Sequence, residues 1–366
     1  MESASAKVIL VTDQPPLSGI GVYVTNLHDL LRESFPEIEV RNLYYFRCPD
    51  APPHQRMPEQ RYAQSRLGVP GVLRYNERTF SRQLKGTRPL IHLCGASYDM
   101  AARVERSVAT VMDFGLRTFG SLLSTQPPLL LVEGYSMVDW LRTPRFLKRC
   151  REIVSPSAYT RTRLRQWTGL DSTVIPLWVD QGRFRPRSKA ESRTRLGLPL
   201  DRRIVLNVAS GAAYKNHAML RRVVEALPPE YLLVRIGHPL PGRPTRVRNE
   251  GRVTEDQYPH YFDAADAYLH VSLREGFGIP LLESMSSGTP IVALANPPAP
   301  EVLGGAACLV PPQTGATEFA DSVRSVVESR DAAASLAAAG LERIRKFDPS
   351  EVRTSYTEVY LNAMRS

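Results

Sequence analysis

Short apolar runs alternate with longer stretches of helical periodicity along the chain. In the first half, these runs lie at 8–11, 90–93, 108–111, 129–132 and 153–154. They are rich in aliphatic and β-branched residues, and such runs are typical of parallel strands that are covered on both faces. A helical pattern over 19–33 follows the first run. The first half is therefore predicted to fold as a parallel sheet between layers of helices.

The alternation of strand and helix starts again near residue 200. Strands are predicted at 203–208, 232–236, 267–271, 291–293 and 307–310, and helices at 218–226, 257–265, 317–329 and 331–346. The polar, basic segment 183–195 is predicted to be a linker between the halves, and 350–364 has apolar residues at a helical spacing. Doubly wound sheets bind ligands at the carboxyl ends of their strands. The expected site is therefore a cleft where two such domains face each other.

The composition is that of a folded globular protein. The chain of 366 residues is long enough for two domains, and its 43% hydrophobic and 23% charged residues argue against extensive disorder. No apolar run approaches the roughly 20 residues that span a bilayer, and the acidic start is not expected to form a secretory signal. The four cysteines lie far apart without a Cys-x-x-Cys spacing. We therefore expect reduced thiols and a cytoplasmic protein.

Positive charge is concentrated in one region of the first half. The net charge is +10, and residues 41–88 contain ten Lys or Arg against three acidic residues, with aromatic residues between them. An anionic membrane surface, a phosphorylated acceptor or a nucleic acid would each suit such a region. A solvated basic face without a partner is the alternative. No nucleic-acid-binding motif accompanies the charge, so nucleic acid is not expected, and peripheral contact with the inner membrane face is the partner prediction.

The most informative segment of the sequence is 274–290. Glu275 and Glu283 are separated by seven residues, and Gly276 and Gly278 lie between them. The glycines leave backbone N–H groups uncovered in front of a predicted helix, whose amino end favours an anion. Such a loop can hold a hydroxyl-rich ligand while the helix faces a phosphate. The alternative is an ordinary strand–loop–helix turn with two solvated glutamates.

This segment resembles the Glu-x7-Glu element of the retaining glycosyltransferases called GT4, or glycosyl transferases group 1, which have the two-domain GT-B fold. The resemblance continues through 261–272 upstream and through 289–293 and 300–307 downstream. It is dense over roughly residues 200–312 and patchier before them.

The resemblance implies two Rossmann-like, doubly wound α/β domains that face each other across a cleft. Residues 1–182 would form the acceptor-binding domain and 183–349 the nucleotide-sugar-binding domain. Residues 350–366 would form a helix that crosses back and packs on the first domain.

The resemblance gives Lys215 the role of binding the donor diphosphate, with Asn216 beside it. Lys215 follows a predicted strand and precedes a predicted helix; a surface lysine near a helix start is the alternative. The family often supplies an arginine shortly after this strand, but Ser210 stands at the matching position. The leaving group is then one cation short unless Arg274 or another basic residue contributes.

The signature segment is expected to hold the donor sugar and the ribose. By resemblance, Glu275 faces the sugar, and Gly276, Phe277 and Gly278 present backbone N–H groups. Glu283 accepts hydrogen bonds from the ribose hydroxyls, a role that suits an acceptor-only carboxylate. Without this context, Glu283 is equally consistent with a solvated helix residue.

The first domain contributes further candidates. Gly19 and Gly21 match the family's glycine loop near the donor phosphates or the acceptor, although a tight strand–helix turn explains them too. Many family members have a histidine near the reacting centre where this chain has Met112, and Asp113 after it is an alternative polar contact. His92 is another candidate for the reacting centre, but a lone histidine after an apolar run is more often structural.

The sequence contains no Asp-x-Asp and no cluster with the spacing of metal ligands. We therefore expect metal-independent chemistry, as the resemblance also implies, with Lys215 and helix dipoles at the leaving group. No cofactor is expected beside the nucleotide-sugar substrate, which would be GDP- or UDP-linked.

The predicted function is retaining transfer of a hexose from a nucleotide sugar to a glycan, lipid-linked or small-molecule acceptor. The sequence Gly-Phe-Gly-Ile-Pro at 276–280 favours a sugar of the mannose type. The alternatives are a nucleotide-sugar epimerase of the same fold and a non-catalytic nucleotide-sugar or glycan-binding protein. Ser210 and Met112 favour the non-catalytic alternative, whereas Lys215, Glu275 and Glu283 argue against it.

Overall fold

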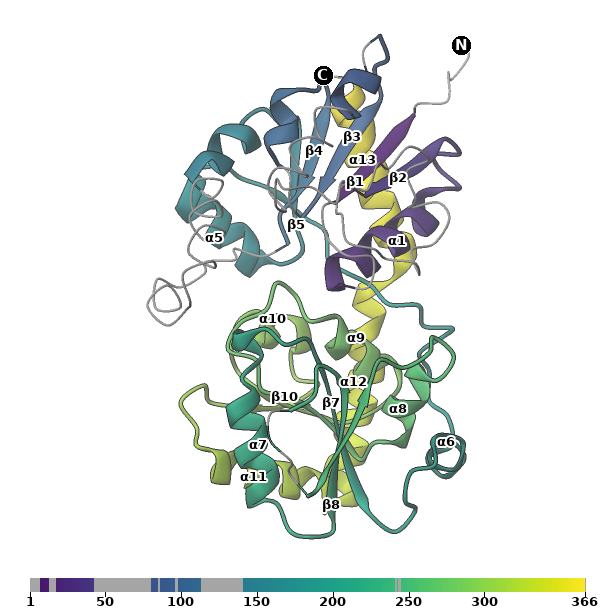
Figure 1. Cartoon of the computed structure of the whole chain (residues 1–366), viewed down its shortest axis with the longest axis vertical. Coiled ribbons are helices and arrows are strands. Elements are labelled where there is room, and N and C mark those ends of the chain that lie inside the picture. Colours follow the sequence, from purple (N-terminus) through teal and green to yellow (C-terminus); the bar gives the residue numbers. More distant parts are fainter. Residues whose placement is uncertain are drawn as a thin grey trace, which may run out of the picture. The chain divides into compact units, whose positions relative to one another are not determined.

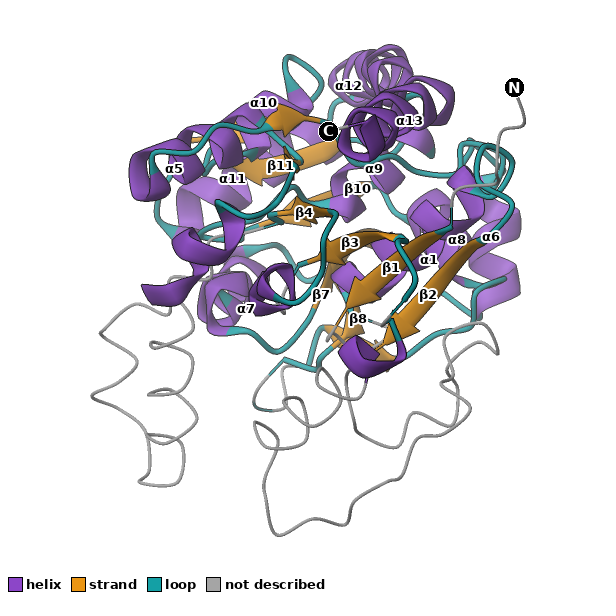
Figure 2. Cartoon of the chain, turned by 90° about the horizontal axis from the view of Figure 1, so that it is seen from above, coloured by secondary structure: helices purple, strands orange, loops and turns teal. Residues whose placement is uncertain are grey.

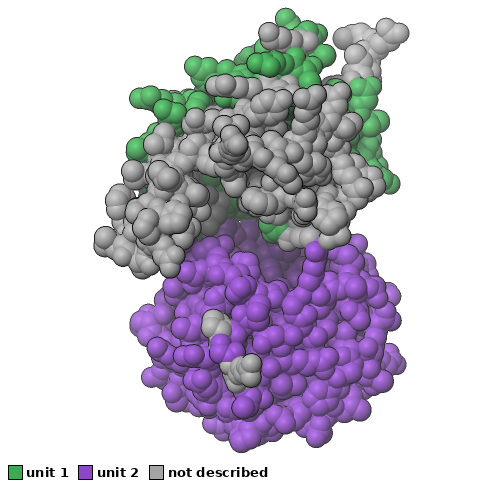
Figure 3. Space-filling model, in the orientation of Figure 1, with its two compact units in different colours: residues 1–176, 350–366 green, residues 177–349 purple. Residues whose placement is uncertain are grey.

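The computed structural model describes residues 7–12, 18–42, 80–84, 86–95, 98–112, 141–240, 242 and 245–365. The chain forms two compact units: residues 1–176 with 350–366 are unit 1, and residues 177–349 are unit 2 (Figure 3). This boundary lies close to the predicted one at 182/183, and the last residues group with the unit that begins the chain. The cleft expected between two domains stays a prediction.

Unit 1 is built on a parallel sheet with the strand order β2-β1-β3-β4-β5-β6 (Figures 1 and 2). Its strands are β1 (Val8–Thr12), β2 (Ile38–Asn42), β3 (Leu90–Cys94), β4 (Ser107–Thr110), β5 (Glu152–Ser155) and β6 (Thr173–Val174). Its helices include α1 (Gly19–Leu31), η2 (Tyr98–Ala102), α5 (Ala158–Thr168) and α13 (Pro349–Arg365). The apolar run at 129–132 lies outside the described residues. The sequence prediction missed β2, in which buried and half-buried residues alternate, and the two-residue β6.

Alternate residues of this sheet face different layers of helices. Ile91 and Leu93 of β3 belong to a buried cluster that also contains Leu164 of α5. His92, between them, contacts the ring of Tyr360 on α13. Since successive residues of a strand point to opposite faces, α5 and α13 cover opposite faces of the sheet.

Unit 2 is built on a second parallel sheet with the strand order β12-β11-β10-β7-β8-β9. Its strands are β7 (Arg203–Ala209), β8 (Tyr231–Gly237), β9 (Val247–Gly251), β10 (Ala267–His270), β11 (Ile291–Leu294) and β12 (Cys308–Val310). Its helices are α6 (Lys189–Leu196), η3 (Ala213–Lys215), α7 (His217–Ala226), α8 (Tyr258–Ala264), α9 (Ile279–Ser286), α10 (Ala299–Leu303), α11 (Ala316–Val327), α12 (Arg330–Arg343) and η4 (Ile344–Phe347). The predicted α/β class with two doubly wound parallel sheets is confirmed.

The segment 183–195 is more than the linker that its composition predicted, because it contains most of α6. The Ser188 hydroxyl accepts a hydrogen bond from the Glu191 N–H at the start of this helix, and Gly197 ends it in the left-handed conformation. Capping of this kind satisfies the free backbone groups at the ends of a helix. The sequence prediction missed this helix because its basic residues suggested a solvated linker, whereas one of them, Arg193, is buried.

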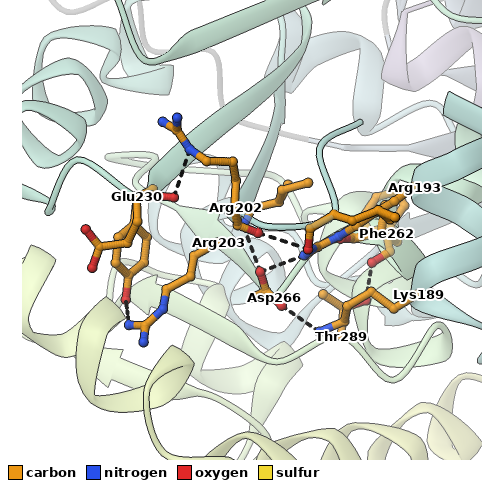
Figure 4. Close-up of polar contacts among 12 residues, drawn as sticks. Lys189, Arg193, Arg202, Arg203, Glu230, Phe262, Asp266 and Thr289 are labelled. Carbon is orange, nitrogen blue, oxygen red and sulfur yellow. Dashed lines mark hydrogen bonds and ion pairs between the residues drawn. The ribbon is translucent and has the colours of Figure 1, made fainter. Parts of the chain in front are cut away.

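A polar network anchors α6 to the sheet (Figure 4). The Asp266 carboxylate accepts hydrogen bonds from Arg193 Nη2 (2.8 Å), Lys189 Nζ (2.7 Å) and the Ile204 N–H (2.7 Å). Asp266 directly precedes β10 and Ile204 lies at the start of β7, so the network lies at the amino ends of these strands. The opposite, carboxyl ends are left to the loops that carry the candidate site.

Candidate functional site

The candidate site lies at the carboxyl ends of neighbouring strands of unit 2. β10 and β7 are adjacent, and β8 follows β7. β7 leads through Ser210 into η3, whereas β10 ends at His270 and leads into residues 271–278, which we call the signature loop. Because parallel strands end at the same edge of a sheet, both loops arise from that edge.

Lys215 and Glu275 form an ion pair there. The distance from Lys215 Nζ to Glu275 Oε1 is 2.5 Å, and the two side chains are 15% and 11% exposed. Burial alone would raise the pKa of the Glu275 carboxyl, but the Lys215 ammonium, His270 and the Ser272 hydroxyl outweigh it and hold the pKa below its ordinary value. Glu275 is therefore an anion. The structure thus joins two residues for which separate roles were predicted.

A second cation lies beside this pair. The Lys215 ammonium and the Arg274 guanidinium lie 5.3 Å and 5.2 Å from the centre of the Tyr214 ring, which are cation–π distances. The Leu273 N–H donates to the Tyr214 carbonyl oxygen (2.8 Å), so the backbone also ties the two loops together. Arg274, the alternative cation named from the sequence, thus contacts the same aromatic ring as Lys215.

His270 is a buried titratable residue that the sequence prediction missed. Its side chain is 5% exposed, and in the described part of the chain no hydrogen bond to its ring is found. Burial lowers the pKa of His270 to about 4, so the ring is neutral at pH 7, and it interacts electrostatically with Glu275 and Lys215. A polar residue at the end of the apolar run 267–271, directly before the signature loop, was the available signal.

A buried arginine fixes the loop that begins with Ser210. Arg235 of β8 is 1% exposed. Its Nη2 donates to the Ala209 carbonyl oxygen (3.1 Å) and to His217 Nδ1 (3.2 Å), and its Nε donates to the His238 carbonyl oxygen (2.9 Å). Burial lowers the pKa of Arg235 to about 10, which leaves it charged. Ser210 itself is exposed. Arg235 therefore positions the loop. The sequence prediction missed Arg235 because it lies within an otherwise apolar strand.

Backbone conformation and packing fix both loops. Asn216 has a φ of 56°, which asparagine tolerates, and it turns the chain from η3 into α7. Gly278 has a φ of +98°, and a Cβ there would lie 2.9 Å from Leu281 Cδ1, so glycine is required. The Phe277 side chain is 4% exposed, and its ring lies 5.8 Å from that of Phe347. Phe277 therefore anchors the loop, while its backbone remains the part expected to meet a ligand.

Glu283 lies on α9 and is paired with a tyrosine. The Tyr258 hydroxyl donates to Glu283 Oε2 over 2.6 Å. Glu283 is 7% exposed, and burial raises the pKa of its carboxyl to about 7, although the hydrogen bond from Tyr258 and the charge of Arg183 act in the opposite direction. It is thus not the solvated helix residue of the alternative interpretation.

The predicted residues of the first domain lie in unit 1. Gly19 and Gly21 occupy the first turn of α1, where the Ser18 hydroxyl accepts from the Gly21 N–H (3.0 Å). Met112 follows β4 and is 7% exposed. Asp113 lies outside the described residues.

His92 has the surroundings of a core histidine. It is fully buried in β3, and its ring nitrogens hydrogen-bond to the Tyr360 hydroxyl (2.6 Å) and the Thr110 hydroxyl (2.7 Å). Burial lowers the pKa of His92 to about 3. These contacts give no support to the catalytic role that the sequence left open, and they agree with the structural alternative.

The described residues contain neither a metal-binding cluster nor a membrane-spanning helix. No group of three or more His, Cys, Asp or Glu residues in these ranges is arranged to hold a metal ion. No helix in the same ranges has the length and apolar character needed to cross a membrane. Metal-independent chemistry stays a prediction.

Sequence comparison links the second unit to a known family. Residues 188–343 match the model of the family described as Glycosyl transferases group 1. The predicted resemblance to this family is confirmed over that segment.

Two relatives extend the match. The chain is 26% identical over 239 residues to the teichuronic acid biosynthesis glycosyltransferase TuaC of Bacillus subtilis (strain 168), covering 61% of this chain and 60% of the relative. It is 29% identical over 221 residues to the D-inositol 3-phosphate glycosyltransferase of a Nocardioides species, covering 52% and 48%. The matched part of the chain thus spans about half the length of these relatives.

Solved structures show the fold of the whole chain. Sucrose-phosphate synthase from Thermosynechococcus elongatus matches with a TM-score of 0.78 and 20% identity, covering 98% of this chain and 99% of that one. Anabaena HepE in complex with UDP-glucose matches with a TM-score of 0.75 and 17% identity, covering 97% and 99%. The predicted GT-B class is confirmed.

Proposed function

We propose that the protein is a retaining glycosyltransferase that moves a hexose from a nucleotide sugar to a hydroxyl of an acceptor. The observation that carries this proposal is the Lys215–Glu275 pair at the carboxyl edge of the unit 2 sheet, inside the segment that matches the family. A fixed cation, a second cation on the same aromatic ring and a charged carboxylate are suited to a diphosphate and a sugar.

In the proposed reaction, the bond between the anomeric carbon and the diphosphate oxygen breaks, and a bond from the acceptor oxygen forms on the same face. The acceptor proton passes to the departing diphosphate. Lys215 and Arg274 would stabilise the negative charge that develops on the leaving group, because preorganised charges act most where charge develops. Glu275 would accept hydrogen bonds from the sugar hydroxyls, and Glu283 from those of the ribose.

UDP is the first donor nucleotide to test, since the matched HepE structures contain UDP, UDP with glucose, or UDP-glucose. GDP is the second, because a short segment resembles an Escherichia coli protein named O-antigen chain mannosyltransferase B, at 38% identity over 66 residues. The mannose-type sugar and the glycan, lipid-linked or small-molecule acceptor belong to the proposal.

The test is thermal unfolding of the protein with UDP, GDP, ADP, dTDP and CDP, without added metal. A nucleotide at a hundred times its dissociation constant stabilises the folded state by about 2.7 kcal/mol. We expect one nucleotide to raise the melting temperature and Lys215→Ala to abolish the shift. No shift with any of the five would overturn the proposal.

A non-catalytic binding protein and an epimerase remain the alternatives to exclude. A binder would shift in melting temperature yet release no nucleoside diphosphate from any nucleotide sugar with any acceptor. An epimerase would convert the nucleotide sugar without an acceptor. Release that requires an acceptor, with the anomeric configuration of the product assigned by NMR, distinguishes the transferase from both.

The proposal includes peripheral binding to an anionic membrane. Most of the basic region 41–88 lies outside the described residues, but a second basic segment supports this partner. Residues 141–151 contain no acidic residue and five exposed basic ones, Arg142, Arg145, Lys148, Arg149 and Arg151. Anionic lipids attract such segments. Sedimentation with vesicles of neutral and of anionic lipid tests it, and equal binding to both would contradict an electrostatic contact.

A further inference from the structure

The contact between Tyr258 and Glu283 joins two helices of unit 2. Tyr258 begins α8, and Glu283 lies in the middle of α9. The donor–acceptor distance of 2.6 Å is that of a charge-assisted hydrogen bond from a hydroxyl to a carboxylate. In the described part of the chain, no other hydrogen bond to the Glu283 side chain is found. One carboxylate oxygen is therefore engaged by the protein, and the other has no such donor.

Packing leaves the tyrosine little freedom to turn away. Its ring lies 5.8 Å from that of Phe184 and 5.5 Å from that of Phe262, in both cases edge to face. Such pairs add about 0.5–1.5 kcal/mol beyond the area they bury. The hydroxyl is thus held at one place, and Glu283 is oriented by it.

The charged and titratable groups around Glu283 come from several elements. Tyr258 lies on α8, Tyr268 lies on β10, and Arg183 and Glu255 precede α6 and α8 respectively. Arg183 is itself engaged, because its guanidinium forms an ion pair with Glu255 over 2.5 Å. Tyr258 is therefore the group whose hydrogen bond stabilises the ionised form of Glu283 most directly, whereas burial of Glu283 favours the neutral form.

We infer that Tyr258 is the positioning residue for nucleotide recognition by Glu283: its hydroxyl donates to one carboxylate oxygen, holds the carboxylate in place and leaves the other oxygen for the ribose hydroxyls. This inference rests on the proposed function, because it needs a nucleotide at Glu283. It predicts that selectivity for ribose over deoxyribose depends on Tyr258 and on pH. In an ionised carboxylate both oxygens act only as acceptors, whereas a protonated one uses part of its capacity as a donor.

The experiment measures the dissociation constants of UDP and 2′-deoxy-UDP by titration calorimetry at pH 7 and pH 9. For Tyr258→Phe, we expect UDP binding about five- to tenfold weaker than in the wild type at pH 7, the loss of one hydrogen bond. The loss should shrink at pH 9, where the carboxyl ionises without help. Binding of 2′-deoxy-UDP should change little, so the preference for UDP should fall at pH 7.

Two further variants make the result interpretable. Tyr231→Phe is the control, because it removes the same kind of contact elsewhere in unit 2. Tyr231 begins β8, and its hydroxyl donates to Glu328 Oε1 over 3.1 Å. This variant should leave UDP binding unchanged. Glu283→Gln cannot ionise, so its UDP binding should be weak and should lose the part of the pH dependence that Glu283 causes. It thereby separates this part from the titration of UDP itself.

The outcomes separate the inference from the proposed function. If UDP binds to the wild type and Tyr258→Phe binds it equally well at pH 7, the inference is overturned and the proposed function stands. If none of UDP, GDP, ADP, dTDP and CDP binds to the wild type, both the inference and the proposed function are overturned. A Tyr258→Phe protein with a lowered melting temperature but an unchanged ratio of UDP to 2′-deoxy-UDP affinity would show a packing role and would also overturn the inference.

Discussion

Each of the two sheets contains a buried histidine, and the two have opposite surroundings. His92 lies inside β3 of unit 1, where two hydroxyl groups satisfy both ring nitrogens. His270 is the last residue of β10 in unit 2, and no described residue hydrogen-bonds to its ring. Burial lowers the pKa of both rings, to about 3 and about 4. A polar group that the protein satisfies itself stabilises the fold, and one that it leaves open at the end of a strand is available to a ligand.

The largest expected effect lies at the site beside His270. Lys215→Ala should lower kcat/KM at least about 100-fold, since removal of one group that stabilises transition-state charge costs this much in other enzymes. The melting temperature of the protein without nucleotide should also fall, because Glu275 loses its partner in a largely buried ion pair, so turnover is compared at a temperature at which the variant is folded. The control is Arg222→Ala, which removes an exposed positive charge of the same unit. Equal losses in both variants would mean that only net charge matters.

A slightly smaller effect is expected in unit 1, and on stability. His92→Leu leaves the buried hydroxyls of Tyr360 and Thr110 without their partner, which should cost about 2–4 kcal/mol of unfolding free energy. UDP should still bind to unit 2 in the folded variant. Chemical denaturation and calorimetry measure the two quantities. Full stability of His92→Leu would refute the structural role, and normal stability with lost turnover would restore the catalytic one.

Acid should destabilise the protein through both histidines. Each ring has a folded pKa below its unfolded value of about 6.5, so the unfolded state binds more protons and stability falls as the pH drops below that value. The expected loss is about 1.4 kcal/mol for each histidine at pH 5.5. Denaturation at pH 7.5 and pH 5.5 measures it. Because His270→Leu removes one of these groups, its loss between the two pH values should be smaller by that amount.

The smallest effect is expected when His270 itself is replaced. His270→Leu removes a ring that no described residue satisfies, so stability at pH 7.5 should be unchanged or higher. Nucleotide-sugar affinity should fall about fivefold, the equivalent of one hydrogen bond. If His270→Leu lowered the free energy of unfolding as much as His92→Leu does, the inferred difference between the two histidines would be contradicted.

The sequence predicted most of the sheets because their strands are short, apolar and buried on both faces. It missed β2, in which buried and half-buried residues alternate, and β9, which has no fully buried residue. It took α6 for a linker because a buried arginine cannot be told from a solvated one in the sequence. In the site, the sequence was enough to identify the spacing of Glu275 and Glu283 and the position of Lys215. It did not identify the residues that contact them or position their loops, Tyr258, Tyr214 and Arg235. These residues make their contacts through tertiary packing that no local sequence pattern encodes.

The assignment of α13 to unit 1 has a consequence for how the protein folds during synthesis. The hydroxyls of Tyr23 and Tyr356 hydrogen-bond across 333 positions of sequence. The part of the first sheet that α13 covers therefore remains exposed until α13 has been synthesised. Unit 2, by contrast, is a continuous segment and can complete its core as soon as it has been made. The half of the protein that is synthesised first is thus the half that is finished last.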